Sequence, residues 1–144
     1  MGVLVWSPLS KGMLTGRYRK GQPLPDSIRV KYMPRQMSDA RSLDTVEQLI
    51  PLAQEAGLSL THMAMAFVMA HRGVTSAILG PRTMQHFDDL LAGAEVCLGD
   101  DVLDRIDQIV PPGSNVGLNE AAYKPPAILQ AGLRRRPTVE RAAA

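Results

Sequence analysis

The sequence predicts an α/β protein that is mostly helical and contains a small parallel sheet. Two short apolar segments, residues 3–6 and 75–79, have the character of buried strands. Stretches with apolar residues at helical spacing lie between and after them. Because parallel neighbours need a helical crossover, this order favours a parallel sheet. Two strands are too few to be buried on both faces, so we expect the chain to form part of a larger architecture.

Capping residues and helical periodicity predict four helices. The first covers residues 42–56, with Ser42 as its N-cap. Ser59 is expected to cap the second helix, whose apolar residues recur at i, i+3, i+4 and i+7. The third begins near Thr83 and the fourth at Asp100. The first, second and fourth of these helices carry an apolar face, which is typical of helices that pack against a core.

Two segments lack such periodicity. Residues 12–41 combine glycines, prolines and basic side chains, and they indicate a long loop of the kind that is usually functional or disordered. We expect residues 1–113 to form the α/β unit and residues 114–144 to be an extended basic tail.

The charge distribution, the single cysteine and the length of the apolar stretches limit the classes of protein to which this chain can belong. The chain has 144 residues and a net charge of +2, but residues 42–123 are acidic and both flanking segments are basic. Such segregation suits phosphate or an anionic polymer as partner, and solvated ends explain it equally well. The single cysteine, Cys97, cannot form an internal disulfide or a zinc site alone. No apolar stretch is long enough to span a bilayer, and we predict a cytoplasmic protein.

The candidate chemistry lies in the two loops that follow the predicted strands. They are WSPLSKGMLTG, residues 6–16, and SAILGPR, residues 76–82. In parallel α/β folds, ligands bind at the carboxyl ends of the strands. Arg82 stands beside the N-terminus of the helix that Thr83 caps, an arrangement suited to an anion, and Lys11 supplies a second cation. The histidines do not fall at metal-ligand spacing, and we predict neither a metal site nor a catalytic set.

Together, SPLSKGMLTG and SAILGPRTMQHF resemble the aldo-keto reductase family. The resemblance covers residues 2–113 and implies the C-terminal portion of a (β/α)8 TIM barrel, incomplete, with two of the eight strands. It also implies NADP(H) as cofactor, with Arg82 pairing with the ribose 2′-phosphate, Trp6 stacking on the nicotinamide and His86 standing where the family has Gln. The cofactor-binding residues carried over are Trp6, Ser7, Pro8, Leu9, Lys11, Gly12, Leu14, Gly80, Arg82 and His86.

The family's catalytic Asp, Tyr, Lys and His belong to earlier strands of the barrel. None of Tyr18, Tyr32 and Tyr123 matches the position of the catalytic tyrosine. We therefore expect the parent enzyme to reduce aldehydes or ketones and this chain alone to be inactive. The missing N-terminal half of the barrel is an expected partner, and a truncated gene or a misplaced start codon would explain the half-enzyme.

Two other functions compete with this interpretation. A non-catalytic interaction or cofactor-holding module would use the same loops without chemistry. A nucleic-acid binder is suggested by the helix-turn-helix-like spacing of Ala53 and Gly57 and by the basic ends. Residues 60–70 are mostly apolar, however, whereas a recognition helix needs polar and cationic side chains.

Overall fold

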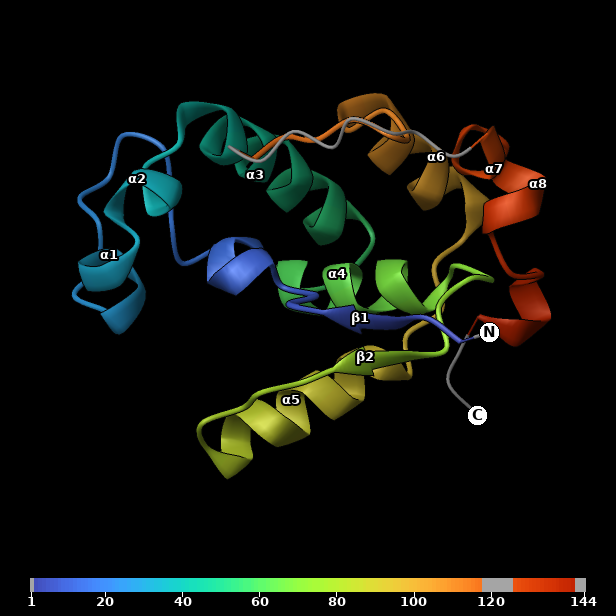
Figure 1. Ribbon diagram of the computed structural model, residues 1–144, viewed down its shortest axis with the longest axis horizontal. Helices are drawn as coiled ribbons and strands as arrows, with labels where there is room; N and C mark the ends of the chain where they lie inside the picture. Colours follow the sequence, from blue (N-terminus) through green and yellow to red (C-terminus); the bar gives the residue numbers. More distant parts are fainter. Residues whose placement is uncertain (1, 118–125, 142–144) are drawn as a thin grey trace.

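The computed structural model describes residues 2–117 and 126–141, and Figure 1 shows the arrangement of their elements. The elements, in chain order, are β1 (Leu4–Trp6), the 3-10 helix η1 (Ser10–Thr15), α1 (Ile28–Tyr32), α2 (Pro34–Met37), α3 (Ala40–Glu55), α4 (Leu60–Met69), β2 (Ser76–Ile78), α5 (Met84–Ala94), α6 (Asp100–Ile109), α7 (Pro126–Leu129), α8 (Ala131–Arg134) and the 3-10 helix η2 (Thr138–Glu140).

The two strands pair in parallel, as predicted. Leu4 lies opposite Ser76, Val5 opposite Ala77 and Trp6 opposite Ile78. The connection between them contains α3 and α4, the helical crossover that a parallel pair requires. The chain is therefore mostly helical with a two-stranded parallel sheet.

Only one face of this sheet is covered by the described residues. Val5 and Ala77 are half-buried on the side of α4, whereas the opposite face carries Leu4, Trp6 and Ile78, which are 61%, 73% and 52% exposed. The two strands alone are thus not buried on both faces, in agreement with the expectation that two strands are too few for this. The physical reason is that helices cover one face only, while the apolar composition of each strand suits coverage of both.

The core lies between the helices. α4 packs against α3 and α5, and α6 packs against α3 (Figure 1). The largest fully buried side chains lie on α2, α3, α4 and α6 and in the segment before α6. They are Met37, Val46, Leu52, Met63, Met65, Leu98 and Leu103.

Local signals identify most of the helix starts. Ser59 Oγ accepts a hydrogen bond from the backbone N–H of His62, and Thr83 Oγ1 accepts one from His86, which confirms both predicted caps. The first long helix differs, because its N-cap is Asp39 rather than Ser42. The Asp39 carboxylate accepts hydrogen bonds from both the backbone N–H and the hydroxyl of Ser42, so the helix begins earlier than predicted.

The expected long loop contains short helices. η1, α1 and α2 all lie within residues 10–37. The described part of the C-terminal segment is not extended either: α7, α8 and η2 fold back against α6. Arginines in this segment form ion pairs with aspartates of α6, a long-range arrangement that the local sequence does not reveal.

None of the helices in the described parts of the chain is both long and apolar enough to cross a membrane.

The packing of α6 gives a stability prediction. Leu103 is 1% exposed, so Leu103→Ala should leave a cavity and lower the free energy of unfolding by about 2–5 kcal/mol. Val139 is 93% exposed, and Val139→Ala should change stability by less than about 0.5 kcal/mol. Urea unfolding followed by circular dichroism measures both. Equal effects of the two substitutions would contradict the placement of α6 in the core.

Candidate functional site

Two loops leave the sheet at the same end. Trp6 and Ile78, the last residues of β1 and β2, are register partners, so the segments that follow them begin side by side. In Figure 1 both strands point toward the end of the molecule where η1 and the start of α5 lie. The loops that carry the sequence-predicted site residues therefore start from the same carboxyl edge of the sheet, the edge where parallel folds bind ligands.

The first loop has an unusual backbone. Ser7, Ser10 and Lys11 have φ values of 56°, 47° and 59°, a region that residues with a side chain rarely adopt. Ser7 Oγ accepts a hydrogen bond of 3.0 Å from the backbone N–H of Lys11 and so stabilises the turn. Gly12 follows with φ 101°, where a side chain would be strained. Such strain concentrates at functional sites.

The second loop is open and cationic. A Cβ on Gly80 would meet no atom within 4 Å, which leaves space for a ligand to approach the backbone. Arg82 is exposed and forms no ion pair among the described residues. Arg82 lies just before α5. The first backbone N–H groups of a helix have no acceptor within the helix, and here the Thr83 side chain accepts a hydrogen bond from one of them, that of His86. Exposed N–H groups and a guanidinium together suit a phosphate.

A cavity of about 620 Å³ adjoins the first loop. It lies between β1, η1, α3, α4 and the end of α6, and most of its wall is apolar. Five of the ten predicted residues line it, namely Trp6, Ser7, Pro8, Lys11 and Leu14. The other five, Leu9, Gly12, Gly80, Arg82 and His86, do not. The structure therefore brings the two loops to one edge without enclosing them in one cavity.

The polar groups of this cavity come partly from residues that sequence reasoning missed. Lys11 Nζ donates a hydrogen bond of 3.5 Å to Gln36 Oε1. Gln36, Asp39 and Ser42 line the wall together with Lys11. The hydrogen bonds that the Asp39 carboxylate accepts from Ser42 lower the pKa of that carboxyl. The unusual length of the loop at residues 12–41 was the available signal, because long loops often carry functional side chains.

An ion pair anchors this long loop to α3. Arg19 donates two hydrogen bonds to the Glu47 carboxylate, at 2.7 and 2.8 Å, and the backbone N–H of Lys20 donates a third, at 3.0 Å. Tyr18, which is buried, lies within hydrogen-bond distance of Ser27, at 3.2 Å between the two hydroxyl oxygens. The contacts of Arg19 and Lys20 with Glu47 thus attach the loop to α3, and the contact between Tyr18 and Ser27 joins two parts of the loop itself.

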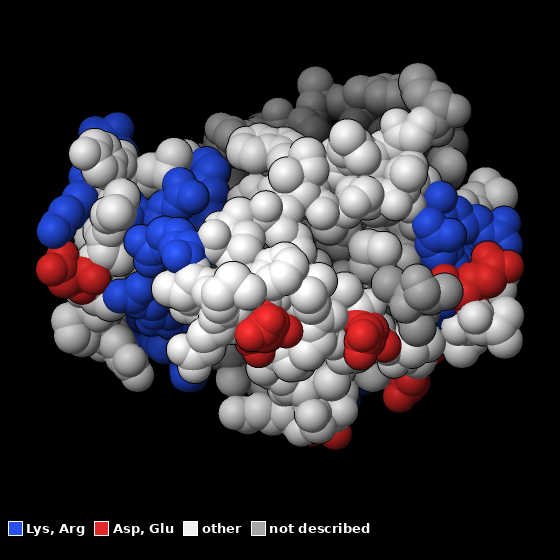
Figure 2. Space-filling model, turned by 90° about the horizontal axis from the view of Figure 1, so that it is seen from below, with Lys and Arg blue, Asp and Glu red and all other residues white. Residues whose placement is uncertain are grey.

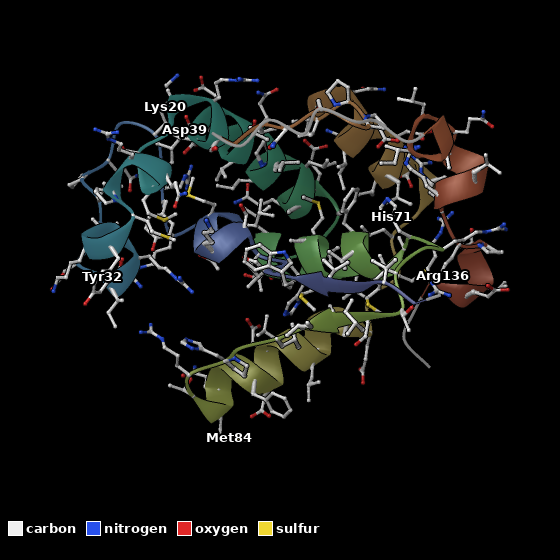
Figure 3. All side chains as sticks on the ribbon, viewed as in Figure 1. Lys20, Tyr32, Asp39, His71, Met84 and Arg136 are labelled. Carbon is white, nitrogen blue, oxygen red and sulfur yellow. The ribbon has the colours of Figure 1, made fainter. Side chains whose placement is uncertain are left out.

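Basic side chains gather at the end of the molecule where η1, α1 and α2 lie, as Figure 2 shows. Arg29 and Arg35 form no ion pair within the described parts of the chain. Figure 3 shows Tyr32 and Met84 at this end of the molecule and His71 and Arg136 at the other end. The cations and the two loops therefore share one end.

The histidines have structural surroundings. His62 Nε2 lies 2.8 Å from Asp89 Oδ1 and links α4 to α5. His71 stacks edge-on against Phe67, and burial lowers its pKa. No group of three or more His, Cys, Asp or Glu side chains within residues 2–117 and 126–141 could hold a metal ion.

The helix that a helix-turn-helix interpretation would need lies in the core. On α4, Met63 and Met65 are 2% and 1% exposed. A recognition helix must present polar side chains to the bases of DNA, so this burial does not support nucleic-acid binding through α4.

These features define a parallel α/β protein with a loop edge that is suited to an anion. The comparison with protein families agrees: the model described as the aldo/keto reductase family matches residues 1–111. The chain belongs to the aldo/keto reductase family, as its sequence motifs predict.

Curated relatives include oxidoreductases and channel subunits. The chain is 29% identical to an uncharacterized oxidoreductase, YrpG, of Bacillus subtilis, and 27% identical to an L-glyceraldehyde 3-phosphate reductase of Escherichia coli, in both cases over 78% of the chain. It is 29% identical, over 76% of the chain, to a probable voltage-gated potassium channel subunit beta of Arabidopsis thaliana. The matches cover 33%, 34% and 35% of these relatives, so the chain spans about a third of their length.

The anchoring ion pair gives a pH prediction. The hydrogen bonds from Arg19, then that from Lys20, lower the pKa of Glu47 from 4.5 to about 2. The stabilisation that this pair provides should therefore be complete above pH 4.5 and lost as the pH falls toward 2. Carboxyl NMR titration measures the pKa directly. Arg19→Ala should return the Glu47 pKa toward 4.5, and Lys31→Ala, which removes an exposed pair with Asp26, should leave it unchanged.

Proposed function

We propose that this chain is the NADP(H)-binding C-terminal portion of an aldo-keto reductase, within an incomplete (β/α)8 barrel, and that the parent enzyme reduces aldehydes or ketones. The observation that carries the proposal is the parallel register of Trp6 with Ile78, which sets the two family motifs at one edge. Family membership supports the reaction class. A cytoplasmic location fits this role and stays a prediction.

The second loop fits the phosphate end of the dinucleotide. Arg82 offers a planar charged fork to a ribose 2′-phosphate, and the space around Gly80 admits the ligand close to the backbone. His86 lies in the first turn of α5, where its ring can reach the adenosine end. The absence of an ion pair at Arg82 among the described residues means that the guanidinium need not leave a carboxylate in order to bind phosphate.

The first loop fits the pyrophosphate and the nicotinamide. In the proposal, Lys11 and the loop backbone bind the pyrophosphate, while the exposed ring of Trp6 stacks on the nicotinamide. The remaining members of this set, which shape the turn, are Ser7, Pro8, Leu9, Gly12 and Leu14. The bound cofactor would supply the hydride for carbonyl reduction. This chain's residues hold and orient the cofactor.

The chain alone is proposed to be inactive. Catalytic proton donation needs a tyrosine at the carbonyl. Tyr18 is buried and hydrogen-bonded to Ser27, and Tyr32 is 82% exposed on α1. Tyr123 lies outside the described residues. None of the three matches the family's position for the proton donor.

The bare sheet face supports a barrel partner. Leu4, Trp6 and Ile78 expose apolar area on it, and both strands have a free edge among the described residues. Met84 and Leu91 of α5 are 70% and 44% exposed. We propose that the other strand–helix units of the barrel cover this face, whether they belong to the same polypeptide or to another.

A non-catalytic cofactor-holding or interaction module is the second candidate. Such a module would use the same two loops. The similarity to a probable potassium channel subunit beta, a relative that is not named as an enzyme, supports this second candidate. The two candidates differ in whether turnover appears when the rest of the barrel is present.

NADPH titration tests the cofactor site. Trp6 is the single tryptophan, so quenching of its fluorescence should saturate with NADPH. Arg82→Gln should weaken NADPH binding about 10- to 100-fold, the loss expected for a charge-assisted hydrogen bond, and should change NADH binding little.

The matched control is Arg72→Gln, another exposed arginine, which precedes β2 and so lies away from the carboxyl ends of the strands. It should leave both affinities within about twofold. Equal, unsaturable responses to NADPH and NADH, or equal effects of the two substitutions, would contradict the proposed site.

Co-expression tests the barrel partner. The N-terminal two thirds of the Bacillus subtilis relative, supplied as a separate polypeptide, should co-purify with this chain and reduce the accessibility of Trp6 to acrylamide. Ile78→Asp should abolish this association, because it would bury a charge on the covered face, whereas Val139→Asp should not. Unchanged quenching in the co-expressed sample would contradict the proposal.

A further inference from the structure

The C-terminal strap, residues 126–141, follows the part of the chain that matches the family. The strap contacts both residues 70–74 and α6, which are separate in the sequence. The backbone N–H of Arg136 donates a hydrogen bond of 2.7 Å to Ala70 O, and that of Arg72 donates one of 2.6 Å to Arg134 O. His71 and Arg135 form an antiparallel bridge. The strap is thereby attached to residues 70–74, the turn that leads into β2.

The strap is also attached to α6 by arginine side chains. Asp100, Asp104 and Asp107 recur at a spacing of four and three residues, which places them on one face of α6. Arg135 donates hydrogen bonds to all three of these carboxylates, at 3.4 Å, 2.8 Å and 2.5 Å. Arg141 pairs with Asp100 at 2.8 Å. Arg134 pairs with Asp107.

Two of these guanidinium groups are buried. Arg135 is 8% exposed and Arg141 is 4% exposed. Arg141 also donates hydrogen bonds to the backbone oxygens of Leu98 and Arg136, at 3.0 and 2.9 Å. A buried guanidinium that loses its partners has a large desolvation cost, so the strap should attach and detach as a unit.

Apolar burial contributes little to this attachment. Leu129, Leu133 and Val139 of the strap are 62%, 55% and 93% exposed. The arginines face inward and these apolar side chains face solvent, the reverse of the usual helix pattern. The carboxylates of Asp100 and Asp104 are more than half exposed, so dissolved ions can reach the pairs. The attachment of the strap therefore depends mainly on ion pairs, whereas the stability of the apolar core does not.

We propose that the strap is an electrostatic latch: the Arg134, Arg135 and Arg141 contacts to α6 hold that helix and residues 70–74 together, and high salt releases them while the apolar core stays folded. The latch and the cavity share one helix, because Ile106 and Val110, from α6 and its C-cap, line the cavity wall. It lies at the end of the molecule away from the two loops, as the positions of Arg136 and Met84 in Figure 3 show. Release of the latch can therefore be measured separately from ligand binding at the two loops.

Hydrogen–deuterium exchange of the whole chain tests the latch. Between about 50 mM and 1 M NaCl, where screening changes strongly, peptides from the strap and residues 70–74 should exchange at least about tenfold faster, whereas those from α6, which packs in the apolar core, should not. Peptides from the buried half of α3 should not change. Arg135→Gln and Arg141→Gln should produce the fast exchange already at low salt and remove the salt response.

Arg105→Gln is the matched control, since Arg105 lies on α6 but forms an exposed pair with Glu55 of α3. It should leave the strap protected at low salt. Three results would overturn the proposal: no change in the native chain across the salt range, equal exchange in the Arg135 and Arg105 variants, or loss of protection in α3 and α6 at the same salt concentration as in the strap. If the arginine variants do not fold, the salt series on the native chain still decides.

Discussion

The parallel pairing of β1 with β2 is the constraint on which the rest of the structure depends. Three register pairs align segments that are about seventy residues apart in the sequence. Because the strands run in the same direction, the loops that follow them must leave at one edge. A shift of the register by one residue would turn Trp6 toward the helices and Val5 toward the open face. The position of the candidate site therefore follows from backbone hydrogen bonds more than from the loops themselves.

The two ends and the two faces of the molecule are stabilised differently. Helices α3, α4 and α6 bury an apolar core on one side of the sheet, while the opposite face carries exposed Leu4 and Ile78. At the loop end, strained backbone lies near arginines that form no ion pair among the described residues, an arrangement that suits the proposed anion site. At the other end, arginines and aspartates attach the C-terminal strap. The proposed function unites the first two features, because a barrel segment needs both an open sheet face and a phosphate-binding loop edge.

Much of this arrangement is predictable from short-range signals. The strands, the caps at Ser59 and Thr83, and the start of α6 are fixed by residues within one turn of each element. The side-by-side placement of the loops follows from strand order alone. Long-range contacts are less accessible to sequence reasoning. Nothing local distinguishes Asp39 from Ser42 as a cap, and the burial of Arg135 depends on carboxylates about thirty residues earlier. The cavity is likewise assembled from distant segments, so the length of the loop at residues 12–41 could indicate functional side chains but not that Gln36 lines the cavity wall.

The central claim is that the two loops act together on one dinucleotide. Backbone amide NMR of the labelled chain, recorded during addition of NADPH, measures this most directly. The amides of residues 9–14 and 80–86 should shift along the same saturation curve, while those of the C-terminal strap should stay in place. Shifts confined to one loop, or different saturation curves for the two, would contradict it.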